Sequence, residues 1–289
     1  MKLGLISSAW LGSHVGTAEG IRRTREIGFD CIDIFADPLE IDIRERRLIK
    51  DTCLANGLPV ISVPCVALGL SDFNYAVRRF HVDRAKQYLE FCYELEAKNL
   101  LLVLGDYIWQ QEVIPPQDQW KWAADSVREL GELASTLKLE IAIELEPFHY
   151  SLIKDLLEME RFLDDVGLPA VQANIDISHL ALTSTPADKV KNLRQRIAHV
   201  HISDCDGKKH GDLPPGRGVV EFIPYLEAIR DTGFEGAISI ELEYSPDPDR
   251  IVEWVQEAYR ETDSLLRGLQ LRETGETKPS SHKPAIRLQ

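Results

Sequence analysis

Acidic and histidine side chains recur at every second position in four short apolar segments in the second half of the chain. These segments span residues 140–146, 171–178, 197–203 and 237–243. Because successive side chains of a strand point to opposite faces, each segment is typical of a strand with one apolar and one polar face. The polar faces carry Glu144 and Glu146, Asn174, Asp176 and Ser178, His199 and His201, and Ser239, Glu241 and Glu243. The pattern therefore predicts four strands that direct ionisable side chains toward one axis.

A divalent metal ion is the chemistry that such side chains can support. Carboxylates inside a folded protein lose their hydration, so an unpaired group of them needs a compensating positive charge. Glu, Asp and His side chains offer hard oxygen donors and an imidazole nitrogen, which favours Mn²⁺, Mg²⁺ or Co²⁺ over a thiolate-bound structural zinc. The alternative is that some of these acids lie in solvent at the strand ends, paired with Lys or Arg.

Four further apolar segments precede these strands, at residues 2–8, 31–36, 59–65 and 99–105. Longer amphipathic stretches separate all eight segments, which is the pattern of parallel strands joined by helical crossovers. Eight units of this kind close a barrel. The predicted fold is therefore α/β, a single (β/α)8 TIM barrel over residues 1–271.

The end of the chain predicts one more helix and then a tail. Apolar side chains recur at helical spacing from Ile251 to Leu269, which indicates an amphipathic final helix that covers the eighth strand. Residues 272–289 contain two prolines and few large apolar side chains. We therefore expect a short, mobile C-terminal tail there.

Composition excludes several classes of protein. A chain of 289 residues suits one barrel, and 44% hydrophobic with 28% charged residues indicates a globular protein without a membrane span. The net charge of −14 repels phosphate backbones and anionic lipid surfaces, so we expect neither a nucleic-acid nor a membrane partner. Five separated cysteines without a CxxC pair favour a reducing cytoplasm. The expected partner is a small molecule, and a homo-oligomer stays open.

Five motifs in a fixed order carry a resemblance to a known family. They are IAIELEP (141–147), NIDISH (174–179), HVHISD (199–204), LPPGRG (213–218) and GAISIELE (236–243). Together they resemble the xylose-isomerase-like barrels, which include the sugar phosphate isomerase/epimerases and the ketose epimerases of the D-tagatose 3-epimerase type. The resemblance covers most of the chain.

The resemblance implies specific roles for residues of this chain. It makes Glu144, Asp176, His201 and Glu241 the ligands of one divalent ion, with Mn²⁺ expected first and Mg²⁺ or Co²⁺ as alternatives. Glu144 and Glu241 would also form the acid/base pair that moves protons. Glu146 and Glu243 share the parity of these two glutamates and would replace them if the register slipped by two residues.

Substrate contacts follow less directly from the resemblance. His179, three residues beyond Asp176, would contact the substrate near the metal. The epimerases carry an Arg soon after their seventh-strand His, whereas this chain has a longer segment with His210 there, and Arg217 is a candidate to replace that Arg. Trp10 and Trp109 follow early strands and are candidates to stack on a sugar.

The leading functional prediction is a divalent-metal-dependent sugar isomerase/epimerase. It would act on a ketose or a related polyhydroxy carbonyl compound by α-proton abstraction through an enediolate. The closest alternative is a dehydratase or lyase that uses the same site on an inosose, a dehydroshikimate-like compound or a keto-glycoside. An endonuclease IV-like nuclease and a non-catalytic sugar-binding barrel are weaker alternatives, because the nuclease chemistry needs His ligands that the segments 60–68 and 101–107 lack.

Overall fold

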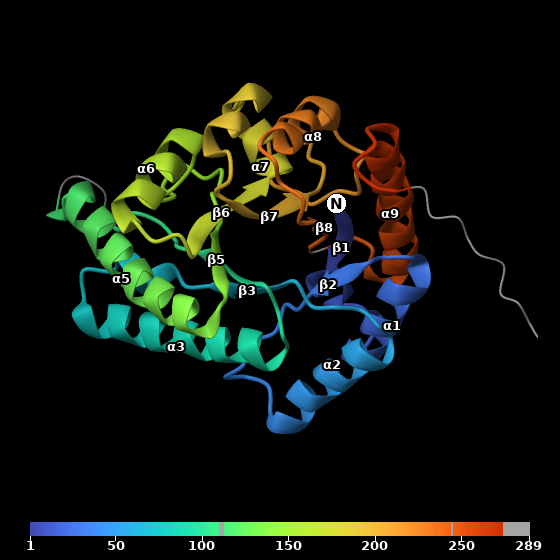
Figure 1. Ribbon diagram of the computed structural model, residues 1–289, viewed down its shortest axis with the longest axis horizontal. Helices are drawn as coiled ribbons and strands as arrows, with labels where there is room; N and C mark the ends of the chain where they lie inside the picture. The colour runs from blue at the N-terminus through green and yellow to red at the C-terminus, as the bar shows by residue number, and fades with distance from the viewer. Residues whose placement is uncertain (110–112, 244, 274–289) are drawn as a thin grey trace, which may run out of the picture.

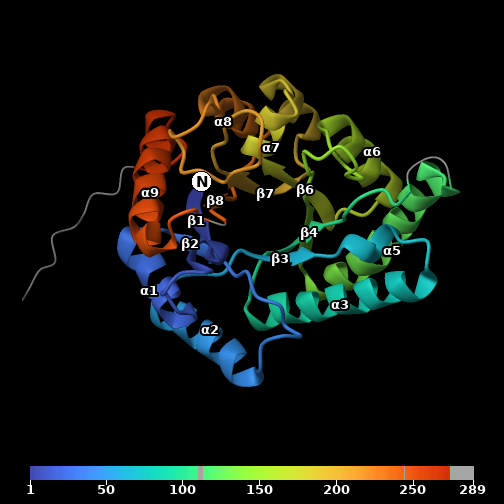
Figure 2. The same cartoon turned by 180° about the vertical axis from the view of Figure 1, so that it is seen from behind.

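The computed structural model of the protein describes residues 1–109, 113–243 and 245–273. Eight parallel strands surround one axis, and helices cover them on the outside (Figures 1 and 2). The strands are β1 Lys2–Ile6, β2 Cys31–Asp33, β3 Ser62–Val66, β4 Asn99–Val103, β5 Glu140–Ile143, β6 Val171–Asp176, β7 Ile197–Ile202 and β8 Ala237–Ile240. The α-helices are α1 Thr17–Ile27, α2 Ile43–Ala55, α3 Tyr75–Glu94, α5 Pro116–Leu137, α6 Leu156–Val166, α7 Ile177–Leu182, α8 Phe222–Asp231 and α9 Ile251–Gly268. Short 3₁₀ turns are η1 Ser7–Trp10, η2 Leu68–Ser71, η3 Ala187–Leu193 and η4 Pro248–Arg250.

The sheet runs in the order β2-β1-β8-β7-β6-β5-β4-β3. Its two ends meet through a parallel bridge between Ile32 and Val60 and through a hydrogen bond from the Ile34 amide to the Ser62 carbonyl at 2.9 Å. The prediction of one parallel (β/α)8 barrel is therefore confirmed, and its carboxyl-end rim is where this architecture places active sites.

The alternation of apolar and polar side chains along the strands puts the polar ones inside the barrel. His199 on β7 forms a hydrogen bond with Asp33 on β2, although two strands separate β7 from β2 in the sheet. Such a contact has to cross the barrel interior. The apolar residues that alternate with the polar ones along a strand, such as Val200 on β7, are fully buried in the core that the strands share with the outer helices.

Several strands are shorter than the sequence predicts, so some of the predicted ligands follow the strands and do not lie within them. β5 ends at Ile143 and β8 at Ile240, so Glu144 and Glu241 come directly after the strands. Each keeps one more ladder bond, because the Glu144 amide donates to Leu102 and the Glu241 amide donates to Ile202. The inward direction of both side chains is thereby preserved at the carboxyl-end rim.

The final helix is present as predicted and lies beside α1 (Figures 1 and 2). Tyr259 of α9 packs edge-on against Phe29 with ring centres 4.9 Å apart. Arg272, the first residue of the predicted tail, donates a hydrogen bond to Asp30 at 2.9 Å. Residues 274–289, the rest of that predicted tail, lie outside the described residues.

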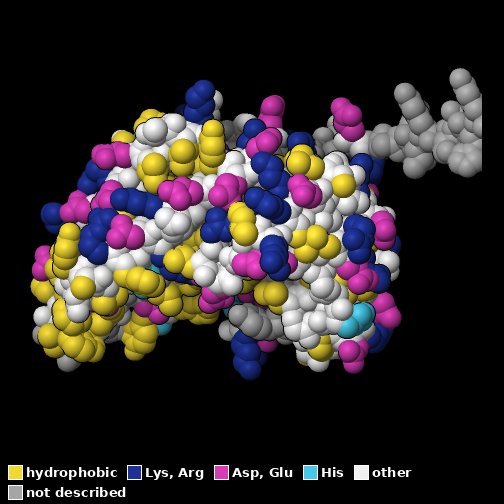
Figure 3. Space-filling model, turned by 90° about the horizontal axis from the view of Figure 1, so that it is seen from below, with side chains coloured by type: hydrophobic (Ala, Val, Ile, Leu, Met, Phe, Trp, Pro, Cys, Tyr) yellow, Lys and Arg dark blue, Asp and Glu magenta, His cyan; other side chains and the backbone are white. Residues whose placement is uncertain are grey.

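Charged and hydrophobic side chains both occur on the surface. On the face shown in Figure 3, acidic and basic side chains are interspersed, with hydrophobic side chains gathered toward one end. Among the described residues, no helix has the length and apolar character needed to cross a bilayer.

Candidate metal centre and active site

Three of the four predicted ligands form one cluster at the carboxyl-end rim. Glu144, Asp176 and His201 each offer a ligand atom, and these atoms lie within 4.8 Å of one another. The fourth, Glu241, places its Oε2 atom 3.3 Å from the Nδ1 atom of His201. The structure therefore brings the four side chains together from the ends of β5, β6, β7 and β8.

The donor atoms of this cluster fit a divalent cation. In the described part of the chain, Asp176 Oδ2, His201 Nδ1 and Glu241 Oε2 are buried without a hydrogen-bond partner. No ion pair between described residues joins a Lys or Arg to any of the cluster's carboxylates. Buried carboxylates and a buried imidazole with free lone pairs are the donors that Mn²⁺ and Mg²⁺ accept, so the residues present suit such an ion.

Local sequence explains how two of these ligands are held. Asp176 caps the N-terminus of α7, because its Oδ1 atom accepts hydrogen bonds from the His179 amide at 2.9 Å and the Ser178 hydroxyl at 2.8 Å. Its other oxygen is left to face the cluster. Asn174, one pleat deeper on β6, donates from Nδ2 to Glu144 Oε1 at 2.7 Å.

In the metal-free cluster, Glu144, Glu241 and His201 are all shifted toward their neutral forms. Asp176 differs, because burial is outweighed by His179 and His201, which lower its pKa. Burial, reinforced by Asp212 and Glu144, raises the pKa of Glu241 well above its usual value. Burial and Asp176 also raise the pKa of Glu144, against the opposing effect of His179. Burial and the neighbouring His199 lower the pKa of His201 to about 3, so its ring is neutral and can donate a lone pair.

Metal binding should therefore depend on pH with a defined sign. A buried carboxyl whose pKa is raised holds its proton more tightly in the folded than in the unfolded chain, so its contribution to folding stability falls as the pH rises above about 4.5. A metal ion must displace these protons. For each proton that is displaced, the metal affinity rises about tenfold with each unit increase in pH. We expect Mn²⁺ to raise the melting temperature more at pH 8 than at pH 5.5, as measured by thermal denaturation. An equal shift at both values would contradict proton displacement.

His179 lies beside the cluster, as the sequence predicts for a substrate contact. Its Nδ1 atom is 2.8 Å from the Leu145 carbonyl, and its Nε2 atom is 3.8 Å from Asp176 Oδ2. Although burial lowers the pKa of His179, Asp176, Glu146 and Glu144 outweigh it and raise that pKa to about 9. An imidazolium here can donate a hydrogen bond from Nε2, which has no partner among the described residues.

His210 and Asp212 extend the site from the loop after β7. The His210 ring lies against His179 with centres 4.6 Å apart, and its Nε2 atom is 3.4 Å from Asp212 Oδ1. Burial, with Asp176 and Glu243 nearby, raises the pKa of Asp212 to about 8. The sequence pattern identified His210 but missed Asp212, because a loop has no strand or helix period from which to infer direction.

The register alternatives occupy different surroundings from the cluster. The described contacts join His201 to Glu144 and Glu241, and none of them joins it to Glu146 or Glu243. Both alternatives are partly buried, and burial raises the pKa of each. The geometry thus supports the first glutamate of each pair as the ligand.

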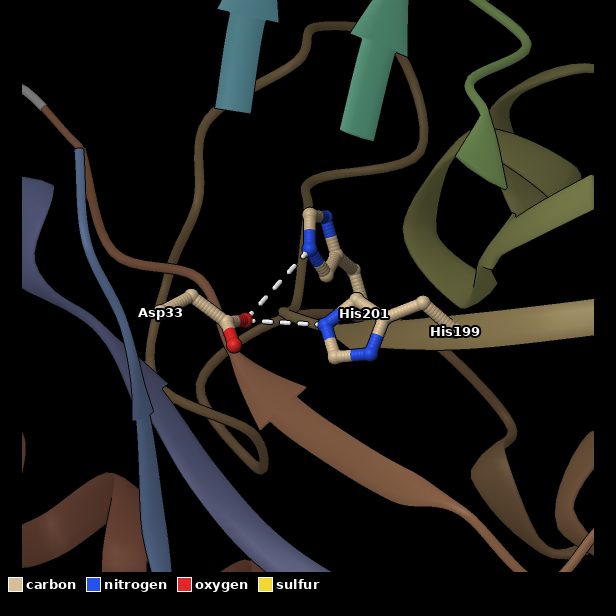
Figure 4. A group of neighbouring side chains, drawn as sticks. All are labelled: Asp33, His199 and His201. Atoms are coloured by element: carbon tan, nitrogen blue, oxygen red, sulfur yellow. Dashed lines mark hydrogen bonds and ion pairs between the residues drawn. The ribbon is translucent and has the colours of Figure 1, made fainter. Parts of the chain in front are cut away.

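Asp33, to which the sequence pattern assigned no role, lies on the far side of His201 from the carboxylates. Asp33 Oδ2 is 2.8 Å from His199 Nε2 and 4.0 Å from His201 Nε2 (Figure 4). A signal was available, because Asp33 lies between Ile32 and Ile34 and so has the parity of an inward side chain on β2.

Comparison with known proteins places this geometry in a family. The profile of the family described as "Xylose isomerase-like TIM barrel" matches residues 21–262. The chain belongs to this family. The resemblance inferred from the five motifs is thereby confirmed.

Relatives of this chain include an epimerase and a dehydratase. The chain is 26% identical to the D-psicose 3-epimerase of Ruminiclostridium cellulolyticum over 233 residues, which cover 76% of each chain. It is 25% identical to the inosose dehydratase of Geobacillus thermodenitrificans over 234 residues, covering 70% of this chain and 75% of that one. The crystal structure of IolI protein with a bound zinc atom superposes with a TM-score of 0.79 at 17% identity, covering 93% and 99% of the two chains.

This xylose isomerase-like barrel directs Arg217 away from the metal cluster. Asp204 accepts hydrogen bonds from the backbone amides of Gly216 and Gly218, and a Cβ atom at Gly218 would collide with the Cys205 carbonyl. Between these glycines, Arg217 points outward and pairs with Glu257 of α9 at 2.6 Å. The expectation that Arg217 contacts substrate is therefore not supported by its placement.

The two tryptophans proposed for sugar stacking have different surroundings. Trp10 is only 5% exposed, donates from Nε1 to Thr24 at 3.3 Å, and lines a cavity of about 600 Å³ near the ends of β1 to β3. Trp109 is 60% exposed and packs against Phe73 with ring centres 5.3 Å apart. Trp10 is thus a packing residue at the wall of that cavity, whereas Trp109 is largely exposed among the described residues.

Proposed function

We propose that the protein is a divalent-metal-dependent sugar isomerase/epimerase that acts on a ketose or a related polyhydroxy carbonyl compound. The observation that carries this proposal is the pair of carboxyl groups, Glu144 and Glu241, that approach His201 Nδ1 from two different strand ends at 3.7 and 3.3 Å. Two carboxyl groups on either side of one bound substrate are what proton removal and proton return require.

Glutamates and histidines of the site have different roles in the proposed reaction. One of Glu144 and Glu241 removes the proton next to the substrate carbonyl, and the other returns a proton, either to the same carbon from the opposite face or to the neighbouring carbon. A bound divalent ion would polarise the carbonyl and stabilise the negative charge of the enediolate. The oxygen and imidazole donors of the site favour Mn²⁺ as this ion. His179 and His210 lie where their ring N–H groups can donate to substrate hydroxyls.

Exchange of the substrate's α-proton with solvent tests this proposal. The metal-loaded protein would be incubated in D₂O with a panel of ketoses, inososes and keto-glycosides, followed by NMR and mass spectrometry. We expect deuterium at the carbon next to the carbonyl, with the substrate's heavy atoms retained and the stereochemistry or carbonyl position changed. Metal-dependent turnover without deuterium incorporation would contradict proton abstraction.

A dehydratase or lyase activity is the second candidate, and Asp212 is the observation that favours it. A buried carboxyl whose pKa is raised to about 8 is protonated near neutral pH and can give its proton to a departing hydroxyl. A glutamate would then take the carbon-bound proton, the C–O bond would break, and water would leave. In the D₂O experiment this activity predicts stoichiometric loss of water or of an aglycone.

The remaining features of the proposal concern partners and location. We propose a small sugar-like molecule as the substrate, with neither nucleic acid nor membrane as a partner. The cytoplasmic location predicted from the cysteines also stays a proposal, and all five cysteines are buried free thiols. Size-exclusion chromatography with light scattering would determine whether the chain forms a homo-oligomer.

A further inference from the structure

A buried carboxylate on the far side of His201 carries a further inference, which rests on the proposed metal site. Asp33 ends β2 and is fully buried in the barrel interior. Its carboxylate faces both His199 and His201, as Figure 4 shows. None of the ion pairs between described residues joins it to a Lys or an Arg. The ionisable partners of Asp33 among the described residues are therefore the two imidazoles.

The two ring nitrogens of His201 face different partners. Nδ1 faces the metal cluster, 3.7 Å from Glu144 Oε1 and 3.3 Å from Glu241 Oε2. Nε2 faces Asp33 Oδ2 at 4.0 Å. A metal-binding histidine typically donates its other ring N–H to a carboxylate or carbonyl, which fixes the tautomer and the ring direction.

Asp33 itself is held from two sides. Its Oδ1 atom accepts a hydrogen bond from the Ser62 amide of β3 at 3.1 Å. Its Oδ2 atom pairs with His199 Nε2 at 2.8 Å. Because His199 lies one pleat deeper than His201 on β7, it supports the carboxylate from below and leaves the side toward His201 free.

We propose that Asp33 is a positioning residue whose carboxylate, 4.0 Å from His201 Nε2, favours a proton on that nitrogen and thereby leaves the Nδ1 lone pair for the metal. His199 acts one step further back by holding the Asp33 carboxylate. The competing reading is a second ion bound by Asp33, His199 and His201, whose ligand atoms lie within 4.8 Å of one another. The short contact between Asp33 and His199 favours a hydrogen bond instead.

Cobalt binding to the metal-stripped full-length protein tests the proposal without reference to activity. Asp33→Asn keeps the size and the oxygen that Ser62 needs but removes the charge that orients His201. We expect isothermal titration calorimetry to show a Co²⁺ dissociation constant raised by about 10- to 100-fold, with an altered visible spectrum of the bound cobalt. An unchanged constant and spectrum in Asp33→Asn would overturn the proposal.

Two further variants separate positioning from a general effect of core substitution. Ser239→Ala removes a buried hydroxyl without a hydrogen-bond partner in the described structure, at the residue paired in register with His201. We expect it to bind cobalt like the wild type. His199→Gln keeps an N–H donor for Asp33 and should bind cobalt more tightly than His199→Ala, whereas equal losses in both would contradict the supporting role of His199.

The wild-type protein provides a measurement that does not depend on any variant folding. In the zinc-loaded protein, ¹⁵N NMR of labelled histidine should show His201 with zinc at Nδ1 and a proton at Nε2. A proton at Nδ1, or two ions bound per chain, would overturn the inference while leaving the metal site intact. If the wild type binds no divalent ion at all, that result contradicts both the proposed function and this inference.

Discussion

Glu241→Gln is expected to reduce metal-dependent α-proton exchange by at least about 100-fold while substrate still binds. The amide keeps the size of the side chain and an oxygen that coordinates weakly, but it cannot accept a proton. Folding should not suffer, because burial and the neighbouring acids Asp212 and Glu144 already make a charge at Glu241 costly in the metal-free protein. Deuterium incorporation at saturating Mn²⁺ measures the exchange, and thermal denaturation checks the fold.

Glu243→Gln is the matched control for this prediction. Glu243 has the same parity, lies two residues further toward solvent, and also has a pKa raised by burial. Because no described contact joins it to His201, its replacement should have a much smaller effect on exchange. A larger loss in Glu243→Gln would move the catalytic assignment to Glu243 and reopen the choice between Glu144 and Glu146.

The parts of the site that lie on strands could be predicted from the sequence. A strand has a fixed period of two, so apolar neighbours such as Ile175 and Val200 determine that Asp176 and His201 face the barrel interior. The same rule holds for Glu144 and Glu241 even though the strands end before them, because each keeps one ladder bond. Strand length is harder to predict, since it depends on pairing with residues distant in sequence.

The loop after β7 could not be predicted in this way. Its shape depends on Asp204, whose carboxylate accepts hydrogen bonds from amides 12 to 16 residues further along the chain. No periodic pattern encodes such contacts. Arg217 therefore points to α9 instead of the site, and Asp212 enters the site although the sequence assigned it no role.

Asp176→Asn is expected to weaken Mn²⁺ binding by more than the roughly 10- to 100-fold that an orienting partner of a ligand costs, and turnover should fall with it. The Oδ2 atom of Asp176 faces the cluster without a hydrogen-bond partner among the described residues, so the substitution removes a charge at the metal. The other oxygen caps α7, and Asn is as good a capping residue as Asp. The fold should therefore survive, which circular dichroism of the metal-free variant would check.

Asp155→Asn separates loss of a metal ligand from loss of a negative charge at a helix N-cap. Asp155 caps α6 by accepting from the Glu158 amide at 2.8 Å, and it has no described contact with the cluster. Calorimetric titration with Mn²⁺ should give the wild-type dissociation constant for this variant and a much weaker one for Asp176→Asn. If both variants bound Mn²⁺ like the wild type, Asp176 would not be a ligand. If both lost binding equally, loss of a cap charge would account for the effect of Asp176→Asn, because that is the change the two substitutions share.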